Sequence, residues 1–178
     1  MRAVNNGMVT PINATQRAQV VSETQIYIER AALIVSKPIP MLPVTFDLTG
    51  RACGMYRVTG RVREIRYNPY IFAKYFADNL AVTVPHEVAH YVVDRLYGRR
   101  KCRPHGAQWQ ALMESFGVDA SRTANYELSG IPLRIQRQFS YHCGCRQHLL
   151  STRRHRKVVR GESLYHCRYC HNEVRFEG

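Results

Sequence analysis

Two histidines and a glutamate have the spacing of a metal-hydrolase motif. Positions 86–90 read His-Glu-Val-Ala-His. On a helix, His86 and His90 are four residues apart and lie on one face, so both imidazoles can reach one metal ion. Glu87 projects beside that ion, where it can accept a proton from an activated water. The pattern predicts catalytic zinc chemistry; the plainer interpretation is two surface histidines on an ordinary helix.

A catalytic zinc usually takes three protein ligands and leaves its fourth position to water. The helix offers two ligands, and the candidates for the third are His105, Asp94 and Glu114. We prefer His105, because the 14 residues that separate it from His90 leave room for the chain to turn. Gly106 would also allow a close backbone approach there. Spacing alone does not decide between the three candidates.

Two further roles in such a reaction have several candidates. The developing oxyanion needs a donor, and Tyr67, Tyr70, Tyr91 and Tyr141 could each supply one. Asp94 could orient a ligand imidazole from behind. A solvated aspartate, one turn past the second histidine, is the interpretation of Asp94 that we favour.

Four cysteines near the C-terminus form two close pairs. Cys143 and Cys145 are followed, after 21 residues, by Cys167 and Cys170. Such pairs are typical of a structural zinc site that holds one tetrahedral ion. The first pair is tighter than usual, and His148 could replace one cysteine; unligated thiols or a redox pair are the alternatives. About 40 residues are too few for a hydrophobic core, so metal would supply the folding energy.

The chain is strongly basic, with a formal net charge of +13. Residues 134–178 hold ten Lys and Arg against three Glu, and so carry +7 of it. We expect a loop between the cysteine pairs to contact nucleic-acid phosphates through Arg153, Arg154, Arg156 and Lys157. Tyr165 and Tyr169 could stack on unpaired bases. The alternative is a solvated loop with core aromatics.

A second basic cluster follows the metal motif, and it could hold nucleic acid near the cleavage centre or be a solvated turn. It comprises Arg99, Arg100, Lys101 and Arg103.

The N-terminus lacks the apolar segment of a signal peptide, and no apolar run is long enough to span a membrane. We therefore expect a cytoplasmic protein with reduced cysteines and no membrane partner.

The elements that must position these residues can be read from periodicity and from breaker residues. We expect a helix over 14–36 capped by Asn13, a strand at 44–48, and strands within 55–67 that turn at Thr59-Gly60. A helix starts at Asn68-Pro69, and another covers 78–97, where Pro85 forces a start near Thr83 or a kink. A further helix covers 106–116. We place a domain boundary at 135/136, where the composition changes.

Several of these motifs together resemble the bacterial SprT proteins, which are similar to the core of Spartan, the eukaryotic protease that degrades proteins crosslinked to DNA. The resemblance is carried by the segments 84–90 (Val-Pro-His-Glu-Val-Ala-His) and 104–109 (Pro-His-Gly-x-x-Trp), by Val44-Thr45-Phe46, by Asn68-Pro69 and by the terminal cysteines. It implies zinc on His86, His90 and His105, with Glu87 as the base. It also favours the four-cysteine zinc set.

We therefore expect an α+β fold, with a zincin-like metallopeptidase core at 1–135 and a C-terminal zinc ribbon at 136–178. The expected function is zinc-dependent peptide hydrolysis on DNA-associated or DNA-crosslinked proteins, with one catalytic and one structural zinc ion. One alternative is a non-enzymatic nucleic-acid-binding protein whose zinc sites are only structural. Another is a zinc hydrolase of small peptides without a nucleic-acid partner.

Overall fold

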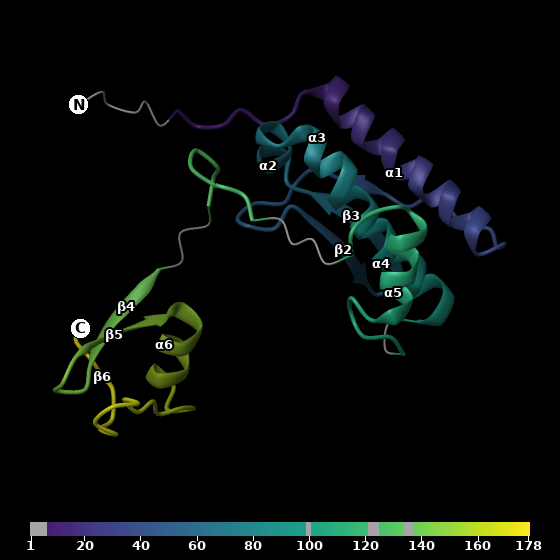
Figure 1. Ribbon diagram of the computed structural model, residues 1–178. Helices are drawn as coiled ribbons and strands as arrows, with labels where there is room; N and C mark the ends of the chain where they lie inside the picture. Colours follow the sequence, from purple (N-terminus) through teal and green to yellow (C-terminus); the bar gives the residue numbers. More distant parts are fainter. Residues whose placement is uncertain (1–6, 99–100, 121–124, 134–136) are drawn as a thin grey trace. The chain divides into compact units, whose positions relative to one another are not determined.

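The computed structural model describes residues 7–98, 101–120, 125–133 and 137–178. The chain forms two compact units, residues 1–133 and 134–178 (Figure 1). In the described residues, the first unit has several helices and a three-stranded sheet, and the second has one helix and a three-stranded sheet. The mixed α+β class expected from the sequence is confirmed. The predicted boundary at 135/136 lies outside the described residues. No helix in the described ranges is long and apolar enough to cross a membrane.

The first unit begins with a long helix and a three-stranded sheet. Helix α1 (Ala14–Ile34) starts at Asn13, whose side chain accepts from the backbone N–H of Gln16 while Gln16 bonds back to Asn13 N–H. This capping box satisfies two N–H groups that a helix start leaves unpaired. Strand β1 (Val44–Thr45) runs parallel to β3 (Val62–Tyr67), and β2 (Gly54–Thr59) runs antiparallel to it. The order β1-β3-β2 leaves β2 at an edge.

The helices after the sheet lead into the motif helix. Asn68 caps α2 (Pro69–Lys74), which is followed by α3 (Phe76–Asp78) and a π-helical turn, η1 (Asn79–Thr83). Helix α4 (Val84–Tyr97) follows directly, with Pro85 in its first turn, where a missing N–H costs little. Gly98, at φ 84°, ends α4. Helix α5 (Ala107–Ser115) completes the unit.

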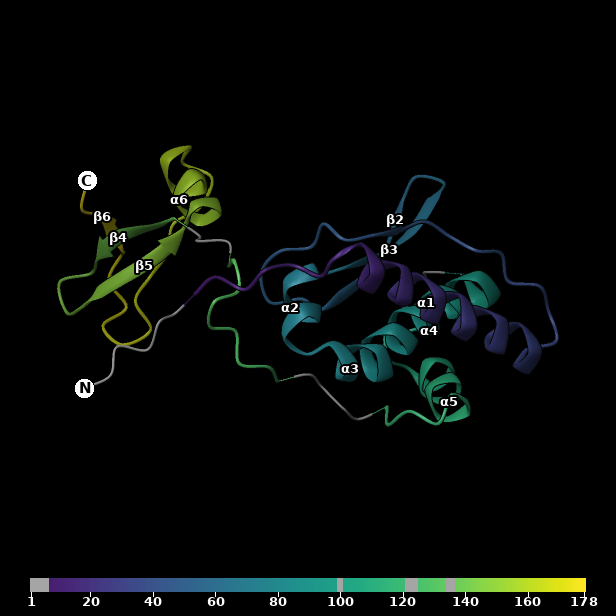
Figure 2. The same ribbon diagram turned by 90° about the horizontal axis from the view of Figure 1, so that it is seen from above.

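Helix α4 is the centre of this unit. It contacts α1, α5, β2 and β3, and α1 and α4 lie side by side in both views (Figures 1 and 2). Nine of its fourteen residues are buried. Val84, Val88 and Val92 form an apolar stripe that is completely buried, which favours packing against the neighbouring elements. The helix that carries the metal motif is therefore held on several sides.

The second unit has a sheet and a core of its own. Strand β4 (Gln138–His142) pairs with β5 (Gln147–Ser151) on one side and with β6 (Arg175–Phe176) on the other, all antiparallel. Helix α6 (Thr152–Val159) follows β5. The buried residues are few and include two cysteines: Tyr141, Cys143, Leu150, Cys167 and Val174. A core this small needs another source of stability.

Candidate metal centres

Three histidine rings meet at one point of the first unit. The Nε2 atoms of His86 and His90 are 3.2 Å apart, and those of His90 and His105 are 3.0 Å apart. The third pair, His105 and His86, is 3.1 Å apart. A tetrahedral ion with bonds of about 2.0–2.1 Å separates its nitrogen ligands by about 3.3 Å. The spacing therefore fits a single metal ion held by three imidazoles.

The protonation of these histidines also suits metal binding. Burial lowers the pKa of His86 to about 4, and the neighbouring His105 adds to the effect. Burial, with the charges of His86 and His105, lowers the pKa of His90 to about 3. Both rings are thus neutral at pH 7, and a neutral imidazole has the lone pair that a metal ligand needs.

His105 lies in the loop between α4 and α5, and its ring reaches the two histidines of α4. Its backbone lies in the left-handed region, at φ 56°, which is uncommon for a residue other than glycine. Gly106 follows, and a Cβ there would lie 3.0 Å from the carbonyl oxygen of Arg103. The loop is therefore tightly wound at the residue that brings in the third imidazole. The other candidate ligands, Asp94 and Glu114, are not in the group.

Trp109 packs against all three histidine rings. Its ring centroid is 4.8 Å from that of His86, 5.6 Å from that of His90 and 4.7 Å from that of His105. Its indole N–H donates to the backbone carbonyl of His86 at 3.3 Å, and only 3% of the residue is exposed. One buried aromatic side chain thus restricts the orientation of every ring in the group.

Glu87 lies beside the histidines in a cavity of about 460 Å³. Burial raises the pKa of Glu87 to about 7, although the hydrogen bond from the backbone N–H of Tyr56 opposes that rise. The cavity is lined by β2 residues 54–58, by one face of α4, by residues 102–105 and by Trp109. A carboxyl group with a pKa near neutrality is suited to accept and return a proton at physiological pH.

The prediction of a solvated Asp94 is wrong, and none of the four candidate tyrosines, Tyr70 included, lines the cavity. Asp94 is 7% exposed rather than solvated, and it bonds to Tyr56 Oη at 2.5 Å and to Arg63 Nε at 2.9 Å, not to an imidazole. Tyr67 and Tyr91 are buried with their hydroxyls on Thr24 and on the Pro40 carbonyl.

Tyr141 belongs to the second unit. Among the described residues that line the cavity, the one tyrosine is Tyr56, which sequence reasoning missed. The alternation of β2 placed Tyr56 on the inner face, but no motif marked it.

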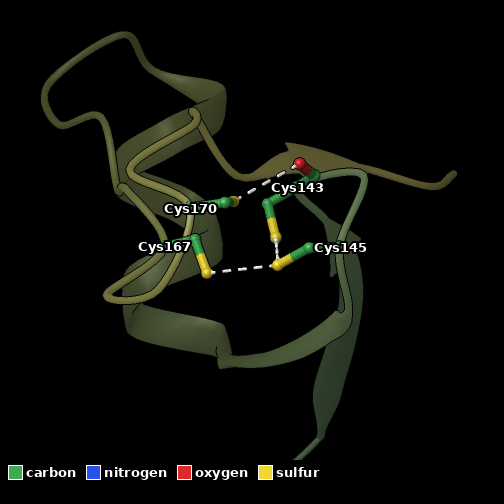
Figure 3. Close-up of side chains that lie close together, drawn as sticks. All are labelled: Cys143, Cys145, Cys167 and Cys170. Carbon is green, nitrogen blue, oxygen red and sulfur yellow. Dashed lines mark hydrogen bonds between the residues drawn. The ribbon is translucent and has the colours of Figure 1, made fainter.

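The second unit brings its four cysteines together (Figure 3). Cys145 Sγ lies 3.3 Å from Cys143 Sγ and 3.7 Å from Cys167 Sγ, and the Sγ atoms of all four cysteines lie within 4.8 Å of one another. Four thiolates at such separations can surround one tetrahedral ion. The group is suited to a structural metal ion, because no ligand position is left for water.

His148 lies next to this group. Its Nε2 is 3.2 Å from Cys143 Sγ, and the hydrogen bond to that sulfur raises the pKa of His148. Burial opposes ionisation of Cys143, but the hydrogen bonds from His148 and Cys145 outweigh it and lower the pKa of the Cys143 thiol. An N–H donor on a ligand sulfur stabilises the thiolate. The geometry therefore favours His148 as a hydrogen-bond donor to Cys143, and the four cysteine sulfurs form the candidate ligand group without it.

The basic residues of the second unit lie on a helix. Arg153, Arg154 and Arg156 are exposed on α6 and Lys157 is partly exposed, so the prediction of a loop is wrong. His155 of the same helix stacks on Phe139, with ring centroids 3.6 Å apart and planes 3° apart. His155 also bonds to Tyr141 Oη at 3.0 Å, and Val158 packs against the core of the second unit, so this face of α6 faces the core while its arginines are exposed.

The two tyrosines predicted to stack on bases differ in their exposure. Tyr165 is partly buried against the core of the second unit. Tyr169 is 71% exposed, with the guanidinium of Arg146 3.5 Å from its ring centroid. In the second basic cluster, Arg103 lines the cavity, whereas Arg99 and Arg100 lie outside the described residues.

The first unit is thus an α+β unit whose three histidines and one buried glutamate could hold and use one metal ion. Residues 25–129 match the model of the SprT-like family. The chain belongs to the SprT-like family, which the sequence motifs had indicated.

Curated relatives cover different shares of the chain. It is 37% identical to Protein SprT of Vibrio parahaemolyticus over 168 residues, which is 94% of this chain and 96% of that relative. It is 44% identical to Protein SprT of Salmonella arizonae over 108 residues, 60% of this chain and 62% of that relative. No solved structure matched the chain.

Proposed function

We propose that the chain is a zinc-dependent metallopeptidase, with a zincin-like domain at 1–135 and a zinc ribbon at 136–178. One observation carries the proposal: three Nε2 atoms, 3.0–3.2 Å apart, converge beside the buried carboxyl of Glu87 in one cavity. His86, His90 and His105 would hold the catalytic ion, and Cys143, Cys145, Cys167 and Cys170 a structural one. Membership of the SprT-like family agrees with this function.

A zinc ion at the three histidines would acidify a water molecule and polarise a substrate carbonyl. Glu87 has the position and the pKa to take the proton of the attacking water and to pass it to the leaving amine. Trp109 keeps the imidazoles in their orientation, and the cavity beside them provides room for a substrate. Arg103, which lines the cavity, adds positive charge to it.

We further propose that the substrate is protein bound or crosslinked to DNA, and that α6 contacts the phosphates through Arg153, Arg154, Arg156 and Lys157. The first turn of α6 has no acidic residue but two arginines. Positive charge is unfavourable at a helix N-terminus, since the helix dipole is positive there. An arrangement that costs stability in the free protein is readily explained by an anionic partner.

The test is a cleavage assay with a DNA-binding protein as substrate, with and without DNA, using wild type and Glu87→Gln. We expect DNA-stimulated cleavage by the wild type, none by Glu87→Gln, and about two zinc ions per chain in both proteins. Cleavage at the wild-type rate by Glu87→Gln would exclude the role given to this residue. Tight DNA binding without any cleavage would favour the non-enzymatic alternative.

A salt titration tests the nucleic-acid partner separately. If α6 contacts phosphates, affinity for DNA falls steeply with salt, and replacing Arg153 and Arg156 by Ala lowers the slope of log affinity against log salt by about 2. Replacing two arginines outside α6, Arg51 and Arg61, keeps the loss of charge the same and serves as the control. Absence of binding at low salt would favour the small-peptide hydrolase.

A further inference from the structure

Tyr56 contacts helix α4 at two points, through two different groups. Its backbone N–H donates to Oε2 of Glu87 at 2.7 Å, and its phenol O–H donates to Oδ2 of Asp94 at 2.5 Å. Glu87 and Asp94 are seven residues apart, so they lie two turns apart on one side of α4, about 10 Å along its axis. A single residue of the edge strand β2 therefore spans both carboxyl groups.

Asp94 is held from a second strand as well. Arg63, on β3, donates from Nε to the same Oδ2 atom at 2.9 Å. Asp94 is 7% exposed, and hydrogen bonds to a buried, charged acceptor are stronger than those between neutral groups. The carboxylate thus ties α4 to two neighbouring strands at once.

Gly54 sets how closely β2 approaches the helix. A Cβ at this position would lie 2.7 Å from Cγ of Glu87 and 2.9 Å from Cγ2 of Thr83. No larger residue fits without movement of the strand or the helix. The lack of a side chain at Gly54 lets β2 lie directly against Glu87, and the backbone amide of Tyr56 bonds to its carboxyl group.

We propose that Tyr56 is a positioning residue for Glu87, and that Asp94 and Arg63 keep Tyr56 in place. The kinetic part of this inference rests on the proposed function, in which Glu87 is the base. A glutamate side chain has several rotatable bonds, and the Tyr56 amide selects one position of its carboxyl group. Displacement of a catalytic group by about 1 Å can lower the rate about 100-fold, so the anchoring of β2 at Asp94 bears on the reaction although Asp94 touches no reacting atom.

Tyr56→Phe is the direct test, because it removes the phenol O–H and keeps both the ring and the backbone amide. We expect kcat to fall about tenfold to a hundredfold while KM and the zinc content change little. Asp94→Asn should have the same pattern, since it weakens the bonds to both Tyr56 and Arg63. A variant that raises KM alone would instead assign Tyr56 to substrate binding and overturn the proposal.

Tyr91→Phe is the matched control. The Tyr91 hydroxyl is also bonded, to the carbonyl oxygen of Pro40 at 2.6 Å, and its ring packs 5.8 Å from that of Tyr56. This variant loses one phenol hydrogen bond on α4 but leaves the bonds to Glu87 and Asp94 intact. We expect a similar drop in melting temperature with kcat near that of the wild type. Equal losses of kcat in both variants would show that Tyr56 contributes only to stability and would overturn the proposal.

A measurement without activity separates this inference from the proposed function. Hydrogen exchange of the amide at position 56 should be slow in the wild type and at least about tenfold faster in Tyr56→Phe and Asp94→Asn. The amide of Ile65, which donates to the Pro43 carbonyl at 3.0 Å in the same sheet, should stay protected. A protein without peptidase activity would refute the proposed function and leave this readout valid. An unprotected amide at position 56 in the wild type would refute the positioning role itself.

Discussion

From the burial of Glu87 we predict how the free energy of unfolding of the metal-free protein depends on pH. The residue is 6% exposed, and burial raises its pKa from 4.5 to about 7, against the opposing hydrogen bond from Tyr56 N–H. A shift of this size corresponds to about 3 kcal/mol of preference for the neutral form in the folded protein. Glu87→Gln replaces the carboxyl by a neutral group of similar shape that can still accept from the Tyr56 amide.

The sign of the pH dependence follows from proton binding. The folded pKa of Glu87 lies above the unfolded one, so between pH 4.5 and 7 the folded state binds more protons than the unfolded state. The free energy of unfolding therefore falls as the pH rises through this window. The contribution of the neutral carboxyl is fully present below pH 4.5 and is lost once the pH passes about 7.

The histidines act in the opposite direction. The pKa values of His86 and His90 are lowered from 6.5 to about 4 and about 3, by burial first and by neighbouring imidazoles second. Their contribution is present above pH 6.5 and is lost as the pH falls through the folded values. Wild type and Glu87→Gln share these histidines, so the difference between the two proteins isolates the carboxyl group.

The assay is urea unfolding of both proteins after removal of metal by a chelator, at pH 5 and at pH 8. Glu87→Gln should be more stable than the wild type by about 1 kcal/mol at pH 5 and by about 3 kcal/mol at pH 8. A difference that does not grow between the two pH values would show that burial of an ionised carboxylate is not the source of the pKa shift, and the reasoning above would be wrong.

Three further predictions concern the ligand rings, the cysteines and the close approach of β2. Trp109→Phe should weaken zinc binding at the histidines about tenfold, measured by competition with a chelator, because smaller contacts orient the rings less well; unchanged affinity would contradict the role of Trp109. Cys167→Ser should remove one zinc ion per chain and unfold the second unit, while NMR signals of the first unit stay in place; a folded second unit would show that metal is not needed there. Gly54→Ala should lower the free energy of unfolding by about 1–3 kcal/mol in urea, because its Cβ would lie 2.7 Å from Glu87, and an unchanged midpoint would contradict that contact.

Several local features could be predicted because they depend on neighbours in sequence. The cap at Asn13, the helix start at Asn68 and the helix end at Tyr97 are confirmed by the structure. Each depends on a few adjacent residues whose side chains or φ angles favour one conformation. The same holds for the turn at Thr59-Gly60 between β2 and β3.

Other features were misjudged because local signals did not contain them. The sequence predicts a loop where α6 lies, since its run of arginines has no apolar stripe. The helix packs on its unit through His155, which stacks on Phe139 and bonds to Tyr141 Oη, and through Val158. The sequence favours a solvated Asp94, since its position one turn past His90 on a helix does not indicate which distant residues pack against it. Its partners, Tyr56 and Arg63, lie more than 30 residues away on two strands.

Sequence spacing predicted the chemical types and the local geometry of the site: two imidazoles four residues apart on a helix, a carboxyl group next to them, and two cysteine pairs. His105 was preferred from spacing and implied by the family resemblance, but its convergence with the other two rings is a tertiary contact. The packing of Trp109 on all three rings and the bond from Tyr56 N–H to Glu87 have no signal in the sequence. The physical reason is that helical spacing acts over a few residues, whereas these contacts join segments that only the packing of the sheet, the loop and the neighbouring helix against α4 brings together.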